Sequence, residues 1–178
     1  MLEGKNINLR LVEKEDIALW MQWANNPEFW GEYNPLRQVT KAEVEKEWDG
    51  PYKGKRFFIE KKDGTKVGFI GGGELWPGES HHLVMGYTLL PDERRKGYGT
   101  EAVALLVDFL FLSADVGRIS AFVDPRNIPS QRVLEKAGFV KEGTLRRGGF
   151  LRGKWSDFLL FGMIKEEWKP TGLLKNLG

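Results

Sequence analysis

The feature that most constrains the fold is a glycine-rich turn that leads into an apolar helix, in residues 91–111, PDERRKGYGTEAVALLVDFLF. Gly97 and Gly99 follow three cations, and apolar residues then recur with helical spacing. Such a turn directs consecutive backbone N–H groups outward at the start of a helix, where they bind phosphate. The stretch therefore predicts a phosphate-binding turn.

Residues 97–102, GYGTEA, also fit the dinucleotide-binding pattern G-x-G-x-x-G/A. In a dinucleotide fold the first glycine follows its strand almost directly, whereas residues 91–96 intervene here. The expected acidic residue lies about twenty positions on, but Asp124 comes 27 positions after Gly97 and precedes a proline. No Lys-Ser or Lys-Thr follows the second glycine, which excludes a Walker-type loop. The three cations beside the turn, Arg95 and Lys96 among them, can neutralise more charge than one pyrophosphate carries, so coenzyme A, which has a further ribose phosphate, fits best.

Composition limits the other function classes. With 178 residues the chain has the size of one domain, and we expect residues 1–178 to form a single domain. A net charge of +2 is too small for a nucleic-acid binder. The absence of cysteine excludes thiolate metal sites and a cysteine nucleophile, and the only histidines are His81 and His82, which argues against a zinc site. No apolar run could span a membrane and no secretory signal is visible, so we expect a cytoplasmic protein.

Periodicity and turn residues predict a mixed α/β fold. Strands are expected at residues 7–11, 56–60, 67–75, 83–90, 118–123, 139–145 and 155–164, and helices at 17–24, 40–49, 99–113 and 127–137. Turns are expected at residues 62–64, 76–78, 147–149 and 152–154, and residues 25–39 are expected to be irregular. The sum is a central, mostly antiparallel mixed sheet of about seven strands with helices on both faces.

Two motifs together resemble the GNAT acyltransferases. Residues 94–99, RRKGYG, look like the family's R/Q-x-x-G-x-G/A loop, and residues 127–139, NIPSQRVLEKAGF, resemble its N-x-x-S-x-x-(V/L)-L-E-K-x-G-F helix. Residues 143–146, 153–157 and 165–168 are similar to the RimJ/RimL branch, the protein N-terminal acetyltransferases. The resemblance spans residues 7–168 and implies an N-acetyltransferase, with acetyl-coenzyme A as cosubstrate and an amine as acceptor.

The resemblance also implies roles for particular residues. Backbone groups of Tyr87, Thr88 and Leu89 would bind the pantetheine arm of the cofactor. Asn127 would contact the pantetheine side and Ser130 would lie near the sulfur, although as plain sequence they read as a helix cap and a first-turn serine. The phosphates would be bound by the backbone amides of six consecutive residues: Arg95, Lys96, Gly97, Tyr98, Gly99 and Thr100.

The catalytic groups depart from the family's pattern. Many relatives carry a tyrosine acid where this chain has Leu134, which leaves Ser130, directly or through water, as the donor to the sulfur. Phe122 stands where some relatives have a glutamate base, so Glu74 and His82 are the remaining candidates for the base, although a histidine beside a turn is commonly just solvated. Without a cysteine, direct attack in a ternary complex is favoured over an acetyl-enzyme intermediate.

The acceptor is left open by the sequence. Residues 25–39, NNPEFWGEYNPLRQV, combine aromatic rings with Glu28 and Glu32, which suits a cationic amine but also suits a loop packed onto the core. An α-amine has a pKa of about 7.7–8.0 and is partly neutral at pH 7, which favours a peptide or protein N-terminus. That acceptor predicts an open groove between residues 25–39 and 146–154. A polyamine or antibiotic acceptor, a non-catalytic acyl-coenzyme A sensor, and a monomer or homodimer all stay open.

Overall fold

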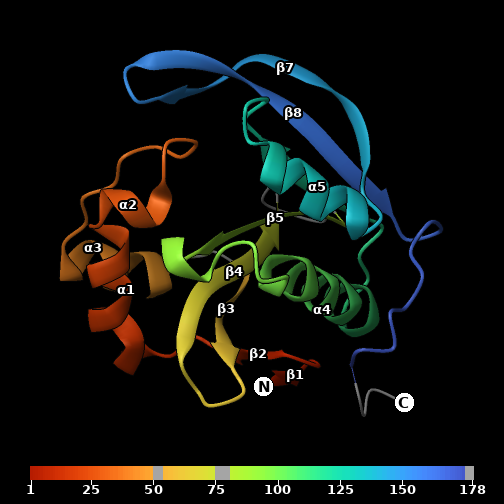
Figure 1. The fold of residues 1–178 in the computed structure, drawn as a ribbon, viewed down its shortest axis with the longest axis horizontal. Coiled ribbons are helices and arrows are strands. Elements are labelled where there is room, and N and C mark those ends of the chain that lie inside the picture. Colours follow the sequence, from red (N-terminus) through yellow and green to blue (C-terminus); the bar gives the residue numbers. More distant parts are fainter. Residues whose placement is uncertain (50–53, 75–80, 175–178) are drawn as a thin grey trace.

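The structure, a computed structural model, describes residues 1–49, 54–74 and 81–174. The strands found there form one sheet in the order β1-β2-β3-β4-β5-β6-β8-β7 (Figure 1). Their bounds are β1 Leu2–Glu3, β2 Ile7–Leu11, β3 Lys55–Lys61, β4 Lys66–Glu74, β5 His82–Leu89, β6 Arg118–Val123, β7 Val140–Leu151 and β8 Lys154–Ile164. Neighbouring strands are antiparallel except β5 and β6, which are parallel. The expected mixed, mostly antiparallel sheet is confirmed, with the two-residue β1 as an additional edge strand.

Helices cover both faces of this sheet (Figure 1). Helices α1 (Ile17–Ala24), α2 (Pro27–Trp30) and α3 (Lys41–Asp49) lie on one face, and α4 (Tyr98–Ser113) and α5 (Ile128–Lys136) lie on the other. Single turns of 3-10 helix precede α1 at Lys14–Asp16 and α4 at Pro91–Glu93. None of the described helices has the length and apolarity that a membrane span requires.

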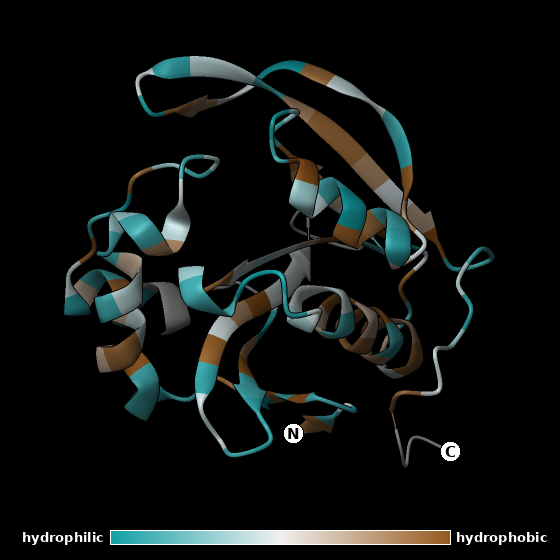
Figure 2. Ribbon diagram, in the orientation of Figure 1, coloured by the Kyte–Doolittle hydropathy of each residue, from teal (hydrophilic) through white to brown (hydrophobic). Residues whose placement is uncertain are grey.

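Each face of the sheet has its own hydrophobic core. Along β3, Phe57 packs into the core beneath α4, and Phe58 packs against α1 and α2, because successive side chains of a strand point to opposite faces. Both are at most 2% exposed, as expected for a strand with helices on either side. In Figure 2 the part of β8 that runs beside α5 is likewise hydrophobic. Strands and helices are therefore fixed on both sides of the centre of the sheet.

Local chemistry accounts for several boundaries. The capping box predicted before α3 is present, since Thr40 Oγ1 accepts from the backbone N–H of Glu43 at 3.3 Å and Glu43 accepts from the backbone N–H of Thr40 at 2.7 Å. Arg152 and Gly153 join β7 to β8 with φ of 51° and 81°, a pair of positive values that is typical of a two-residue hairpin turn.

The structure corrects the sequence-based expectation in two segments. Residues 25–39 are not wholly irregular, because α2 forms there, with Pro27 at its first position and the Asn26 side chain accepting from the backbone N–H of Glu28 at 2.9 Å. The turn expected at residues 147–149 is an irregularity inside β7, whose pairing steps from Leu145↔Phe158 to Gly149↔Ser156. The turn expected at residues 76–78 lies outside the described residues.

Candidate active site

The site begins where β5 and β6 separate. Their parallel pairing ends at Val84 and Ser120, although the strands continue to Leu89 and Val123. A strand edge that has no partner exposes its N–H and C=O groups to whatever lies beside it. The later half of β5 can therefore bind an extended chain that carries amide groups.

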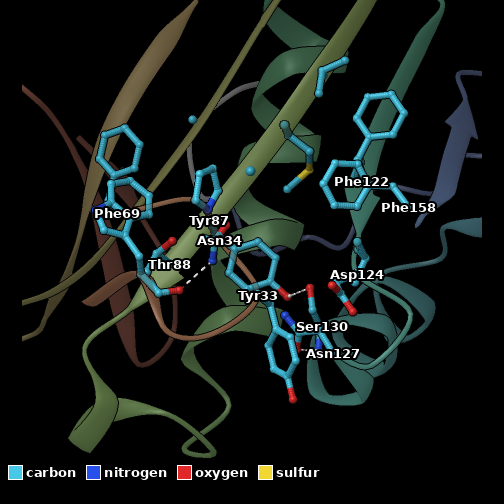
Figure 3. Close-up of a pocket in the computed structure, with 18 of the residues that line it drawn as sticks. Tyr33, Asn34, Phe69, Tyr87, Thr88, Phe122, Asp124, Asn127, Ser130 and Phe158 are labelled. Atoms are coloured by element: carbon cyan, nitrogen blue, oxygen red, sulfur yellow. Dashed lines mark hydrogen bonds between the residues drawn. The ribbon is translucent and has the colours of Figure 1, made fainter. Parts of the chain in front are cut away.

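A cavity of about 500 Å³ occupies this opening. Its wall includes aromatic side chains from several elements, and Asp124 is the only carboxylate among the described lining residues (Figure 3). The lining comes from α1, α2 and the chain after it, from β3, β4, β5, β6 and β8, and from α5 with the residues before it. Its residues are Trp20, Trp30, Tyr33, Asn34, Pro35, Arg37, Arg56, Phe69, Gly71, Val84, Met85, Gly86, Tyr87, Thr88, Ala121, Phe122, Val123, Asp124, Asn127, Ser130, Leu134 and Phe158.

Two hydroxyl groups meet inside the cavity. Tyr87 Oη lies 3.0 Å from Ser130 Oγ, which joins β5 to the first turn of α5 (Figure 3). Burial raises the pKa of Tyr87 to about 12. The sequence predicted a role for Ser130 but only a backbone role for Tyr87. The missed signal is the residue type itself, since a tyrosine hydroxyl in an apolar wall needs a polar partner.

The glycine-rich turn has the backbone geometry that was expected of it. Gly97 caps α4 with φ of 84°, and Arg95 has φ of 64°. Alternation of left- and right-handed residues turns successive N–H groups toward one point, an arrangement that binds anions. In the described structure no side chain caps the N-terminus of α4, so its first N–H groups are available to a ligand. Binding of phosphates by residues 95–100 stays a prediction.

The two glycines have different surroundings. An added Cβ at Gly97 would meet no atom within 4 Å, so glycine is favoured there by the positive φ. Gly99 is buried, and an added Cβ would lie 3.4 Å from Tyr87 Cε2 and 3.8 Å from Val133 Cγ2, which is ordinary van der Waals contact. The ring of Tyr87 therefore lies beside the first turn of α4.

The cations of the turn point in different directions. Arg94 Nε donates to the carbonyl of Leu89 at 3.1 Å. Arg94 Nη2 donates to the carbonyls of Glu28 and Phe29 at 3.3 and 3.1 Å, so Arg94 connects the turn to α2. Lys96 pairs with Glu93 at 2.9 Å and holds the pKa of that carboxyl below its usual range. Arg95 is exposed beside the turn.

Asn127 is the N-cap of α5. Its Oδ1 accepts from the backbone N–H of Ser130 at 3.2 Å, so the capping interpretation is confirmed. Asn127 also lines the cavity, and its contact with a cofactor stays a prediction.

Asp124 is a lining residue to which the sequence had assigned no role. Its side chain is 1% exposed at the end of β6, and it accepts from Arg126 at 2.9 Å from Nε and 2.7 Å from Nη2. The guanidinium lowers the pKa of Asp124, so the group is a carboxylate at neutral pH. Arg126 in turn lies over the ring of Tyr33, with its Cζ 5.6 Å from the centroid. Such a carboxylate can attract a cation but is a weak base.

The backbones of the two predicted bases lie near each other, where β4 ends and β5 begins. His82 contacts Ser120, with Nε2 2.9 Å from Oγ, and burial lowers the pKa of His82. It lies at the closed end of the β5–β6 pair and is not among the described residues that line the cavity. Glu74 is the last residue of β4, where its backbone pairs with Leu83, and its side chain lies outside the described part of the structure. The role of either as a base stays a prediction.

Of the two expected flanks of the acceptor side, residues 25–39 reach the cavity, whereas residues 146–154 do not belong to its described lining. Tyr33 and Asn34 line one side of the cavity, and Phe158 of β8 lines another. At the hairpin tip, Arg152 Nη2 donates to the carbonyl of Gly31 and, at 3.3 Å, to that of Pro27. The groove is therefore bridged at one point. Glu28 and Glu32 are exposed and do not belong to the described lining.

Comparison with known proteins agrees with this geometry. Residues 6–140 match the acetyltransferase (GNAT) domain family. The probable N-acetyltransferase YjcK of Bacillus subtilis is 32% identical over 182 residues, covering 94% of this chain and 98% of the relative. The aminoglycoside N(6')-acetyltransferase type 1 of Klebsiella pneumoniae is 29% identical over 156 residues, covering 79% of this chain and 77% of the relative.

Solved structures with the same fold include two at comparable identity. Mycobacterium smegmatis RimJ in complex with CoA-disulfide superposes with a TM-score of 0.75 at 28% identity, over 90% of this chain and 83% of that one. The ribosomal-protein-S5-alanine acetyltransferase from Vibrio fischeri has a TM-score of 0.78 at 25% identity, over 94% of this chain and 98% of that one. The family resemblance predicted from the two motifs is confirmed. The chain belongs to the acetyltransferase (GNAT) family and is an acyltransferase.

Proposed function

We propose that this acyltransferase moves the acetyl group of acetyl-coenzyme A to a primary amine by direct attack within a ternary complex. The observation that carries the proposal is that the cavity is lined by residues from both faces of the sheet. Its lining includes Trp20, which belongs to the core on the α1 face, and Leu134, which belongs to the core on the α5 face. Two substrates can therefore enter from opposite faces and meet where β5 and β6 separate. A reaction without an acetyl-enzyme intermediate requires such a meeting.

Acetyl-coenzyme A fits the face that carries α4 and α5. The turn at residues 95–100 offers N–H groups to the pyrophosphate, and Arg95 adds positive charge beside it. The open edge of β5, from Tyr87 to Leu89, offers backbone groups to the pantetheine amides. The RimJ structure, solved with coenzyme A as a disulfide, supports the same cosubstrate for this chain.

The reaction requires a neutral amine and a stabilised leaving thiolate. When the nitrogen attacks the thioester carbonyl, the C–S bond breaks and its electron pair stays on sulfur. The nitrogen releases one proton to water or to a base, for which Glu74 and His82 are the candidates, and the thiolate later takes one proton from water. We assign Ser130 as the hydroxyl that donates to the sulfur, since Leu134 fills the position of the family's tyrosine and is fully buried.

The acceptor that we favour is the α-amine of a peptide or protein N-terminus. Asp124 is the only carboxylate in the described lining and is already paired with Arg126, whereas a polycation would be better held by several carboxylates. An α-amine also needs less help from a base than an ordinary alkyl amine. The Vibrio fischeri neighbour, which by its name acetylates an alanine of a ribosomal protein, supports this acceptor class.

A small cationic amine is the second candidate, and Asp124 itself is the observation that favours it. A carboxylate inside an aromatic-lined cavity can orient an ammonium group. The Klebsiella pneumoniae relative is named for an aminoglycoside, a small polycation.

The test is an acetylation screen that follows thiol release from acetyl-coenzyme A. Short peptides with free α-amines, the same peptides with blocked α-amines but a free lysine, polyamines and aminoglycosides are compared at equal concentration. We expect turnover of the free α-amines only, with initial-rate lines that intersect when both substrates are varied. Parallel lines would contradict direct attack, and turnover restricted to polyamines or aminoglycosides would establish the second candidate.

A further inference from the structure

The contact between Tyr87 and Ser130 has a direction that decides whether Ser130 can serve the leaving group. A serine hydroxyl has one hydrogen, and so does a tyrosine hydroxyl. Their oxygens are 3.0 Å apart, so one of the two donates to the other. If Ser130 donates to Tyr87, its hydrogen is used and nothing remains for the sulfur.

The surroundings of Tyr87 favour the opposite direction. The side chain is packed against the core beneath α4 and α5, and its pKa of about 12 keeps the phenol protonated at any ordinary pH. Within the described part of the chain, the Tyr87 hydroxyl forms its hydrogen bond with Ser130. A largely buried hydroxyl that places its hydrogen on no acceptor is destabilising, which favours Tyr87 as the donor.

The ring of Tyr87 is held by packing. It lies against the core beneath α4, beside Gly99, where an added Cβ would lie 3.4 Å from Cε2. Ser130 is held from the other side, because its backbone N–H donates to the Asn127 side chain in the cap of α5. Both oxygens are therefore fixed by secondary structure and not only by each other.

We infer that Tyr87 is a positioning residue for acetyl transfer: by donating its hydrogen bond to Ser130, it leaves the Ser130 hydrogen to point at the cofactor sulfur. This inference rests on the proposed function, in which Ser130 meets the sulfur. No proton moves from Tyr87 to Ser130, and the effect is one of hydrogen-bond orientation. The same arrangement explains how the site works with Leu134 in place of the family's tyrosine.

The test uses the thiol of bound coenzyme A, so it needs no knowledge of the acceptor. The enzyme is saturated with coenzyme A, and the pKa of the bound thiol is measured from the ultraviolet absorbance of its thiolate as pH is raised. The variants are Tyr87→Phe, Ser130→Ala and the double variant. Phenylalanine keeps the ring, and calorimetry with coenzyme A together with urea unfolding verifies that affinity and fold are retained.

We expect Ser130→Ala to raise the pKa of the bound thiol by about one to two pH units, the equivalent of one hydrogen bond to a charged group. Tyr87→Phe should raise it by a smaller amount, because the Ser130 hydroxyl then rotates freely. In the Ser130→Ala background, Tyr87→Phe should leave the pKa of the bound thiol unchanged. This lack of additivity is the result that a purely structural role of Tyr87 does not produce.

Each other outcome overturns the inference in a recognisable way. If Ser130→Ala raises the thiol pKa and Tyr87→Phe does not, Tyr87 does not orient Ser130, while the assignment of Ser130 stands. If the two effects add, Tyr87 acts on the sulfur without Ser130. If neither variant changes the thiol pKa although coenzyme A is bound, Ser130 does not meet the sulfur, and the inference falls together with that assignment.

Discussion

We predict that Arg126→Met destabilises the fold through Asp124. The Asp124 carboxylate accepts three hydrogen bonds from Arg126, from the backbone N–H at 2.9 Å, Nε at 2.9 Å and Nη2 at 2.7 Å. The variant keeps the first and removes two. Removing one partner of a buried ion pair costs about 3–5 kcal/mol. Solvent already screens this pair, since the Arg126 side chain is 61% exposed, so we expect a loss of about 1–2 kcal/mol in the free energy of unfolding at pH 7.

The loss should depend on pH in one direction. Arg126 lowers the pKa of Asp124 in the folded state. A carboxyl whose folded pKa lies below its unfolded value of about 3.9 stabilises the fold above that pH, and the stabilisation is lost as pH falls through the folded pKa. The difference between Arg126→Met and the parent protein should therefore be full at neutral pH and should shrink below about pH 4.

The assay is urea unfolding followed by tryptophan fluorescence at a series of pH values. Asp124→Asn and the double variant complete a double-mutant cycle, which isolates the pair from other titrating groups. A coupling energy at pH 7 that is close to zero, or one that does not change as the pH is lowered, would refute the reasoning.

Three further predictions follow from individual contacts. Gly86 pairs with Gly71 on β4, both line the cavity, and an added Cβ at Gly86 would meet nothing within 4 Å. Gly86→Val should therefore leave the fold intact and raise the KM for the acceptor several-fold in steady-state kinetics. An unchanged KM would mean that the acceptor does not contact this part of the cavity wall. Asp108 accepts hydrogen bonds from Trp168 Nε1 and from the backbone N–H and hydroxyl of Thr171. Asp108→Ala removes this acceptor and should lower the free energy of unfolding by about 2–3 kcal/mol in urea titrations. A loss below about 0.5 kcal/mol would show that water replaces the carboxylate. Gly97→Ala should cost about 1–2 kcal/mol because φ is 84°, and it should weaken coenzyme A binding in calorimetry, so parent-like affinity would place the phosphates elsewhere.

The parts of the fold that were predictable depend on local chemistry. The capping box at Thr40, the cap at Asn127 and the start of α4 after Gly97 each follow from neighbouring residues. Helix α2 was missed although Asn26 and Pro27 are a local start signal. It has only four residues and no helical periodicity, and part of its support comes from Arg94 and Arg152, which are distant in the sequence.

The same distinction between local and distant contacts separates the site residues that were predicted from those that were missed. Ser130 was found because it stands inside a motif, whereas its partner Tyr87 is 43 residues away and only the folded sheet brings the two hydroxyls together. Asp124 was visible as an acidic residue directly after a predicted strand, but its place in the cavity depends on how far β6 continues beyond its pairing with β5. Hydrogen bonds between distant strands and helices leave no periodic signal in the sequence.

The carbonyl groups of α2 are shared by two arginines from different parts of the molecule. Arg94 reaches them from the glycine-rich turn and Arg152 from the hairpin tip. In the proposed function, cofactor and acceptor bind on either side of one small helix that both neighbouring segments hold. If a ligand on the turn orders α2, it also orders the hairpin that contacts α2. Each substrate then raises the affinity for the other, and the two factors are equal because coupling between binding sites is reciprocal. We expect such a mutual gain in affinity between acetyl-coenzyme A and the amine, and we expect Arg152→Ala to reduce it in binding measurements while leaving the turn itself unchanged.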